Sequence, residues 1–127
     1  MQIVPTDPTW LQRLLGVVFD VPVIAFAGVE NGEFIGSCGL AWKEGRCWLW
    51  FQTSAAKPRH AVKIVRYTTT LLAKAAQMGE RAVFTVQDKR FGTSGRLMKI
   101  AGFTPHGNEG GQDVFRRDIG RAADVGV

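Results

Sequence analysis

The sequence contains few residues that could hold a small domain together through disulfides or metal ions. Its 127 residues include two cysteines, Cys38 and Cys47, and two histidines, His60 and His106. These residues lack the close spacing of zinc ligands, and two cysteines are too few for the disulfide framework of a small secreted protein. We therefore expect a reducing, cytoplasmic environment and no metal site. The length is sufficient for one domain with its own hydrophobic core.

Long apolar runs are also absent. The most apolar stretch, Val17–Val29, is interrupted by Asp20 and Pro22. It is shorter than the roughly 20 residues that a membrane-spanning helix needs. The opening residues MQIVPTDPTW do not place a basic segment before an apolar run, as a signal peptide would. We expect a soluble chain without a targeting segment or a membrane partner.

Acidic residues are missing from one long segment. The chain has 16 Lys+Arg and 11 Asp+Glu, a net charge of +5, but residues 45–79 contain six of the basic residues and none of the acidic ones. The rest of the chain, with 10 basic and 11 acidic residues, is almost neutral. A localised positive field suits a phosphate-bearing ligand or a nucleic acid. A solvated basic helix face is the alternative interpretation.

Apolar periodicity and turn residues predict mainly strands in the first part of the chain. The turn Asn31-Gly32 favours a hairpin, because both residues tolerate a positive φ. The expected elements are a short strand over 1–5, a brief helix capped by Asp7 or Thr9 that ends before Gly16, and three antiparallel strands over Val21–Glu30, Glu33–Trp42 and Arg46–Thr53.

The second part of the chain begins with a long amphipathic helix. Apolar or small residues recur with a helical period from Pro58 to Gly79. The elements expected after it are a strand over Ala82–Val86, a helix over 93–101, and a hairpin of 103–106 with 113–117 across a glycine-rich loop over 107–112. A strand, a helix and a further strand in this order form a crossover connection between parallel neighbours. We therefore expect a mixed, mostly antiparallel α/β (α+β) sheet with a central crossover helix. Residues 1–117 would form one domain and residues 118–127 a frayed tail.

This order of elements resembles that of the GNAT superfamily of acyl-CoA-dependent N-acyltransferases. The segment Arg96–Phe103 resembles the family's helix that ends in Gly-Phe, and Asp113–Arg117 resembles its closing strand. The likeness covers most of the chain and is to short, divergent members such as those encoded by phages and prophages. It implies an acyl-CoA N-acyltransferase-like fold, with acetyl-CoA or another acyl-CoA as co-substrate and an unknown amine as acceptor. A homodimer is left open.

The resemblance also implies a binding site at the start of the central helix. In the family's turn, an Arg or Gln precedes two small residues that let backbone N–H groups approach the pyrophosphate of coenzyme A. Arg59 matches the first position, whereas Val62 and Ile64 stand at the small positions. Lys57, Arg59 and Lys63 lie where positive charge is unfavourable unless an anion binds. The implied cofactor-binding residues are Trp50, Phe51, Gln52, Thr53, Arg59, His60, Ala61, Val62, Lys63 and Ile64.

The resemblance supplies no acid or base. Many GNAT enzymes use a tyrosine of the later helix as the acid, but the matching position is Met98, and the only tyrosine, Tyr67, lies on the central helix. The family's usual asparagine position falls near Arg90 or Phe91. The remaining candidates each have a structural alternative as a buried, solvated, capping or loop residue, and they are Cys38, Cys47, His60, Asp88, Ser94 and His106.

Three tryptophans leave a second kind of function open. Trp48 and Trp50 share one face of their strand, and Trp42 precedes it. Core packing is one use of these rings, and an aromatic platform beside a basic helix, which would hold single-stranded nucleic acid, is another. The sequence therefore allows an N-acyltransferase, a catalytically inactive GNAT-like interaction or virion-associated module, or a basic nucleic-acid-binding domain.

Overall fold

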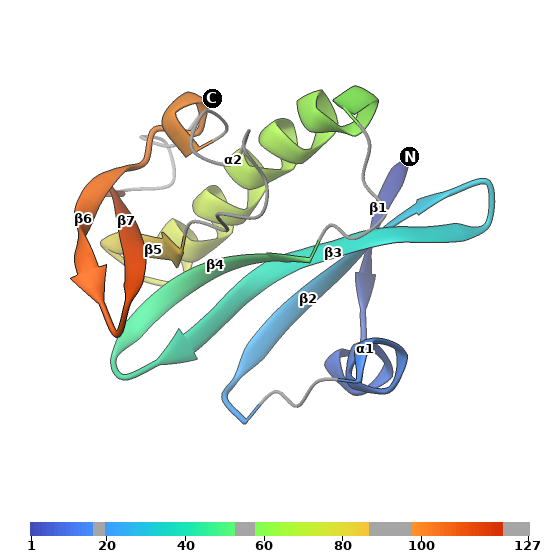
Figure 1. The fold of residues 1–127 in the computed structure, drawn as a ribbon, viewed down its shortest axis with the longest axis horizontal. Helices are drawn as coiled ribbons and strands as arrows, with labels where there is room; N and C mark the ends of the chain where they lie inside the picture. The colour runs from blue at the N-terminus through green and yellow to red at the C-terminus, as the bar shows by residue number, and fades with distance from the viewer. Residues whose placement is uncertain (17–19, 53–57, 87–97, 121–127) are drawn as a thin grey trace.

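A computed structural model describes residues 1–16, 20–52, 58–86 and 98–120 (Figure 1). Their secondary structure follows the predicted order of strands and helices. The strands are β1 (Gln2–Thr6), β2 (Val23–Glu30), β3 (Glu33–Lys43), β4 (Arg46–Gln52), β5 (Ala82–Val86), β6 (Thr104–Glu109) and β7 (Gln112–Asp118). The helices are α1 (Pro8–Leu15), the short 3-10 helix η1 (Pro58–His60) and α2 (Ala61–Gln77), and residues 98–100 are also helical.

The seven strands form a single sheet in the order β1-β2-β3-β4-β5-β7-β6. All neighbouring strands are antiparallel except β4 and β5, which are parallel and are joined through α2. This confirms the predicted mixed, mostly antiparallel sheet with a crossover helix. It also places β4, which carries the apolar run Cys47–Phe51, at the centre of the sheet.

The parallel pair β4–β5 is short. Among the described residues only Cys47 with Val83 and Trp48 with Phe84 are paired, both near the beginnings of the two strands. Beyond them β5 continues to pair with β7 on its other side, while the end of β4 has no β5 partner. The carboxyl ends of the two parallel strands therefore part from each other. Figure 1 shows α2 beginning on the side toward which β4 runs and passing back over the sheet, so that it ends near β5.

A hydrogen bond from a side chain spans the point where the two strands separate. The Thr85 hydroxyl donates to the Leu49 carbonyl oxygen at 2.9 Å, and Thr85 is buried. A β-branched side chain thus supplies the donor that a ladder N–H would otherwise provide. The Thr85 hydroxyl therefore joins β5 to β4 directly after the last paired residues, where the two strands begin to separate.

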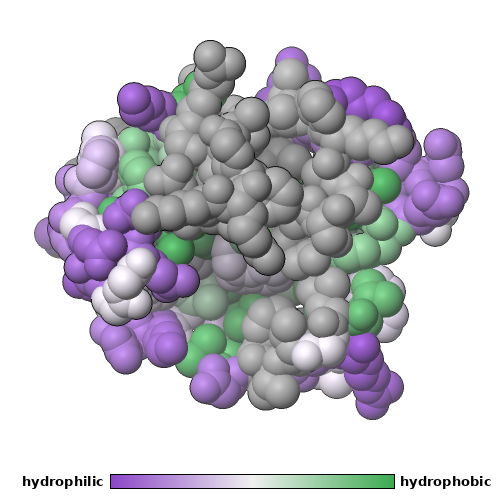
Figure 2. Space-filling model, in the orientation of Figure 1, coloured by the Kyte–Doolittle hydropathy of each residue, from purple (hydrophilic) through white to green (hydrophobic). Residues whose placement is uncertain are grey.

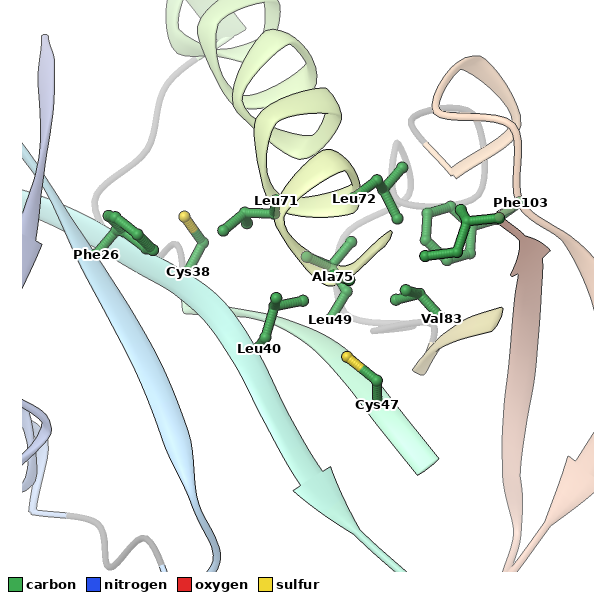
Figure 3. Close-up of a cluster of buried hydrophobic side chains, with 11 residues drawn as sticks. Phe26, Cys38, Leu40, Cys47, Leu49, Leu71, Leu72, Ala75, Val83 and Phe103 are labelled. Carbon is green, nitrogen blue, oxygen red and sulfur yellow. The ribbon is translucent and has the colours of Figure 1, made fainter. Parts of the chain in front are cut away.

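The hydrophobic core lies between α2 and one face of the sheet (Figure 3). Two features bring these side chains together. Every second side chain of a strand points toward α2, and helix side chains three and four residues apart face the sheet. The buried members are Phe26, Cys38, Leu40, Cys47, Leu49, Leu71, Leu72, Ala75, Val83, Phe103 and Ile119. Close packing of this kind fixes the position of α2 over β3, β4 and β5.

The helix α1 lies away from α2 in the fold (Figure 1). Asp7 caps it as predicted, since its carboxylate accepts a hydrogen bond from the Thr9 N–H at 2.8 Å. Gly16 ends it with φ +67°. Leu11 is fully buried, whereas Trp10 is partly exposed and contacts Phe34 edge-on at 6.1 Å between ring centroids. Among the helices that the structure describes, none is long and apolar enough to cross a membrane.

The final hairpin differs from the prediction. The expected loop over 107–112 is instead mostly strand, because β6 runs to Glu109 and β7 starts at Gln112. Gly110 and Gly111 make the tight turn with φ +59° and +83°. A register shift between Pro105 and Gly107 leaves His106 out of the pairing with β7, so the remaining glycine, Gly107, follows a bulge and does not lie in a loop.

Other boundaries differ by a few residues. Pro5 lies inside β1 and does not end it, which is tolerated because β1 is an edge strand. At the other end, β7 includes Asp118 and Ile119 is buried in the core, so these two residues are ordered although fraying was expected from residue 118. Residues 121–127 of that tail lie outside the described residues, and the domain boundary remains a prediction.

Candidate functional site

The start of α2, which comes after β4 in the chain, is where the sequence predicts a binding site. Its cap residue is His60, whose side chain makes no capping hydrogen bond, and its first turn contains no acidic residue. The first N–H groups of a helix lack intrahelical acceptors, and they carry a partial positive charge. Together with the nearby basic side chains, this end of the helix favours an anion.

Glu30, at the end of β2, contacts the start of α2. One carboxylate oxygen accepts a hydrogen bond from Arg59 Nη2 at 2.6 Å, and the other lies 2.9 Å from His60 Nε2. The amino group of Met1 lies 3.4 Å from the same carboxylate. Arg59 and His60 therefore contact a carboxylate that lies thirty residues earlier in the chain, and sequence periodicity gave no signal for this contact.

These contacts change the acidity of Glu30. The hydrogen bond from Arg59 and then the bond to His60 lower its pKa from 4.5 to about 2, because both favour the ionised carboxylate. The His60 side chain is 3% exposed and the Arg59 side chain is 59% exposed. Glu30 thus carries a full negative charge at neutral pH, and Arg59 is the partner that a ligand from solvent can reach.

The next basic residues of α2 point outward. Lys63 and Arg66 are exposed and form no ion pair with the residues that the structure describes. Three residues apart, they lie on the same side of the helix. Hydrophilic side chains gather over this end of α2, at the upper right of the surface in Figure 2. Of the basic residues predicted at the helix start, the structure thus describes Arg59, which is partly neutralised by Glu30, and Lys63, and it adds Arg66 on the same side of the helix.

The predicted residues of β4 lie on both faces of the sheet. Phe51 is 40% exposed and shares a face with Cys47 and Leu49, which pack against α2. Trp50 is half-buried on the opposite face, where its ring lies against Gly39. A Cβ at Gly39 would approach the ring to 2.8 Å and the Ile24 carbonyl oxygen to 1.9 Å, so only glycine fits there.

Some predicted site residues cannot be placed in full. Thr53 and Lys57 lie outside the described residues, as do the four candidates of the later segment, which are Asp88, Arg90, Phe91 and Ser94. The structure describes only the backbone of four others: Gln52 ends β4, and Ala61, Val62 and Ile64 belong to α2.

The fold is shared with solved structures. A scan against protein-family models finds no match, and a search of curated proteins finds none either. The fold is similar to the aminoglycoside 6'-N-acetyltransferase from Enterococcus faecium, with a TM-score of 0.65, 15% identity and coverage of 93% of this chain and 97% of that one. It is also similar to an IAA acetyltransferase from Bacillus cereus, with a TM-score of 0.67, 11% identity and coverage of 93% and 99%. The GNAT domain of S. lividans PAT gives a TM-score of 0.64 at 18% identity, over 90% of this chain and 70% of that one. The chain has the GNAT fold.

The residue that the sequence resemblance matches to the family's tyrosine packs against the core. Met98 is partly buried and packs against the core cluster, where it cannot donate a proton. Tyr67, on α2, packs edge-on against Phe26 with 5.2 Å between ring centroids. Burial and then the nearby Cys38 raise the pKa of Tyr67, so its phenol is a packing group and not a ready acid.

Both cysteines belong to the same core. Burial raises the pKa of Cys38 and of Cys47 to about 12, with Glu80 adding to the effect at Cys47. The thiolate is the nucleophilic form, so neither thiol is poised for catalysis at neutral pH. Among the described residues, no three His, Cys, Asp or Glu side chains gather into a possible metal site.

His106 lies on a strand, as the predicted hairpin over 103–106 implied, but this strand continues to Glu109 and so no loop begins directly after it. Its ring meets Phe84 edge-on at 5.3 Å between centroids. The guanidinium groups of Arg46 and Arg116 also lie near the Phe84 ring, at 4.5 and 5.5 Å from its centroid, and Arg46 bonds to Glu109 at 2.8 Å. This cluster joins the β6–β7 hairpin to the centre of the sheet. The spacing of these residues in the sequence gave no indication of the cluster.

The three tryptophans do not form one stacking platform. Trp42 packs against the core on the α2 side and donates from its indole to Glu80 at 2.9 Å. Trp48 and Trp50 lie on the other face of the sheet, and Trp48 contacts Phe84 at 5.6 Å between centroids. Core packing, the structural alternative for these rings, therefore holds for Trp42, whereas Trp48 and Trp50 contact Phe84 and Gly39 on the opposite face.

Proposed function

We propose that this chain is an N-acetyltransferase that uses acetyl-CoA or another acyl-CoA and acylates an amine. The observation that carries the proposal is the separation of β4 from β5, combined with the basic start of the helix α2 that connects these two strands. The GNAT fold supports the same reaction class. The acceptor is an amine whose structure the described residues do not specify.

The residues of the two strands and of α2 suit the parts of coenzyme A. Past Trp48, the edge of β4 is not covered by the backbone of β5, so an extended pantetheine arm could lie along it. The pyrophosphate would meet the first N–H groups of α2 and the side chains of Arg59 and Lys63. Because the sequence has Val62 and Ile64 in place of the small residues of the family's turn, we expect the phosphates to lie farther from the backbone and the side chains of Arg59 and Lys63 to contribute a larger share of the binding.

The reaction would be a direct transfer in a ternary complex. The neutral amine nitrogen attacks the thioester carbonyl carbon, a C–N bond forms and the C–S bond breaks, and the sulfur leaves as a thiolate that takes up a proton. The amine gives up a proton in the same sequence, so the atoms and charges balance. Backbone N–H groups can stabilise the developing oxyanion. No described side chain at the site is placed to act as the acid.

A second candidate is a CoA-binding module without catalytic activity. The observation in its favour is the burial of Met98, which stands where many GNAT enzymes have a proton donor. Binding without turnover would distinguish this function from the enzyme.

The proposed function predicts stabilisation of the fold by coenzyme A. Acetyl-CoA at 100 times its dissociation constant should add about 2.7 kcal/mol to the free energy of unfolding, which thermal unfolding measures as a higher Tm. Release of free thiol during incubation with a panel of primary amines would then identify an acceptor. Dephospho-CoA and adenosine serve as ligands with fewer or no phosphates, and should stabilise less.

Each result has a distinct meaning. A Tm shift with thiol release supports the enzyme, whereas a shift without release for any amine favours the inactive module. An unchanged Tm at millimolar acetyl-CoA would contradict both. Salt-dependent binding of a single-stranded oligonucleotide in that case would favour a nucleic-acid-binding domain.

A further inference from the structure

Arg59 and His60 form a small anion-binding site, and the anion that they bind is the carboxylate of Glu30 in the same chain. Arg59 and His60 are consecutive, and both direct a nitrogen to one carboxylate, at 2.6 and 2.9 Å. The carboxylate comes from β2, and its two donors come from η1, immediately before α2. The sequence indicated that basic residues at this helix start call for an anion, and in the structure without ligand Glu30 supplies one.

The two donors differ in their access to solvent. The His60 side chain is almost fully enclosed, whereas more than half of the Arg59 side chain is exposed. A guanidinium has five N–H donors and pairs well with phosphate. A phosphate arriving from solvent can therefore approach Arg59, but there it meets a neighbouring carboxylate that already uses one nitrogen of the same group.

We propose that Glu30 is an internal competitor of the CoA phosphates for Arg59. In the unliganded chain the carboxylate holds the guanidinium, and a bound pyrophosphate takes the guanidinium over. The inference rests on the proposed function, because it requires that CoA binds at the start of α2.

Glu30 then has two effects of opposite sign. It stabilises the fold, because it joins β2 to the start of α2 by two charge-assisted contacts. It also weakens anion binding, because it occupies Arg59 and adds a negative charge beside the incoming phosphates. A residue that served only as an anchor would change stability and affinity in the same direction.

The test compares Glu30→Gln with the wild-type chain. We expect the Tm without ligand to fall and the dissociation constant for CoA, measured by calorimetry, to decrease about three- to tenfold, the range that one unit charge near the surface produces. Glu33→Gln is the matched control. Glu33 lies opposite Glu30 in the same hairpin, and its replacement removes the same charge without removing the Glu30 contact to Arg59. It should change the affinity less.

A double-mutant cycle locates the effect. In an Arg59→Ala background, Glu30→Gln should gain much less affinity, because no guanidinium is released. Inorganic pyrophosphate is the second probe, and it should follow the same pattern without any contribution from the pantetheine arm. An affinity for CoA that is unchanged or weaker in Glu30→Gln would overturn the competitor model, as would an equal gain in the Arg59→Ala background.

A measurement on the wild-type chain is available if Glu30→Gln does not fold. Carbon NMR of the Glu30 carboxyl should give a pKa that rises from about 2 toward 4.5 when pyrophosphate saturates the site, since the carboxylate loses Arg59. An unchanged pKa at saturation would overturn the inference. Failure of both the wild type and Glu30→Gln to bind CoA would overturn the proposed function as well, whereas binding and turnover without tighter binding by Glu30→Gln would overturn the inference alone.

Discussion

At the scale of single residues, burial decides which side chains can take part in chemistry. Cys38, Cys47 and Tyr67 carry reactive groups, yet each is packed into the interface between α2 and the sheet, and burial raises the pKa of each. At the candidate site, the charged side chains that solvent can reach are the basic ones at the start of α2. A sequence lists the groups, but their surroundings set their protonation.

The thiols give a direct check of this packing. We expect neither Cys38 nor Cys47 to react with a thiol-specific aromatic disulfide at pH 8 within minutes, since a pKa of about 12 leaves almost no thiolate and both side chains are buried. The same reagent in guanidinium should modify both. Rapid labelling in the native protein would show that the sheet face under α2 is open.

At the scale of elements, the β4–β5 pair determines where a ligand can enter. Two pairs of residues join the parallel strands, and the hydrogen bond from the Thr85 hydroxyl to the Leu49 carbonyl oxygen joins them one residue further along. Hydrophobic periodicity predicted both strands and the helix between them with ends correct to within about two residues. It gave no information on where pairing stops, because that depends on the position of β7 against the other side of β5.

Replacement of Thr85 by Val tests this bridge. The change keeps the shape of the side chain and removes the donor to Leu49, so we expect a loss of about 1–2 kcal/mol in the free energy of unfolding. Thr104→Val is the matched control, because the Thr104 hydroxyl donates to the backbone carbonyl oxygen of Arg116 at 3.3 Å in an exposed position. Urea denaturation of the two variants should give a larger loss for Thr85→Val, and equal losses would contradict the role of the bridge.

At the scale of the whole molecule, contacts between distant segments join the fold to its candidate site. Glu30 ties the β2–β3 hairpin to α2, and the Phe84 cluster ties the last hairpin to the centre of the sheet. The net charge of +5 is concentrated along residues 45–79, but the structure pairs two basic residues of that segment with acidic residues from outside it, Arg46 with Glu109 and Arg59 with Glu30.

The contact of Glu30 predicts how stability depends on pH. The folded state holds the pKa of Glu30 near 2, below its ordinary value of 4.5, so the contribution is fully present above about pH 5 and is lost as the pH falls through 2. The difference in free energy of unfolding between the wild type and Glu30→Gln should therefore shrink from pH 6 to pH 2. Urea titrations at several pH values measure it, with Glu33→Gln as the reference. A difference that stayed constant over this range would show that the carboxylate is not ionised through these contacts.

The sequence by itself determined the order of the elements, the alternation that makes β4 apolar on both faces, the amphipathic α2 and the basic segment around it. These follow from local propensity and periodicity, which act over a few residues. Only the tertiary structure decided that β4 and β5 part beyond Trp48 and that Met98 and both thiols are core residues. It also decided that Glu30 is the partner of Arg59 and His60. The reason is physical: strand separation, burial and ion pairing depend on groups that are distant in the chain, and only packing brings these groups together.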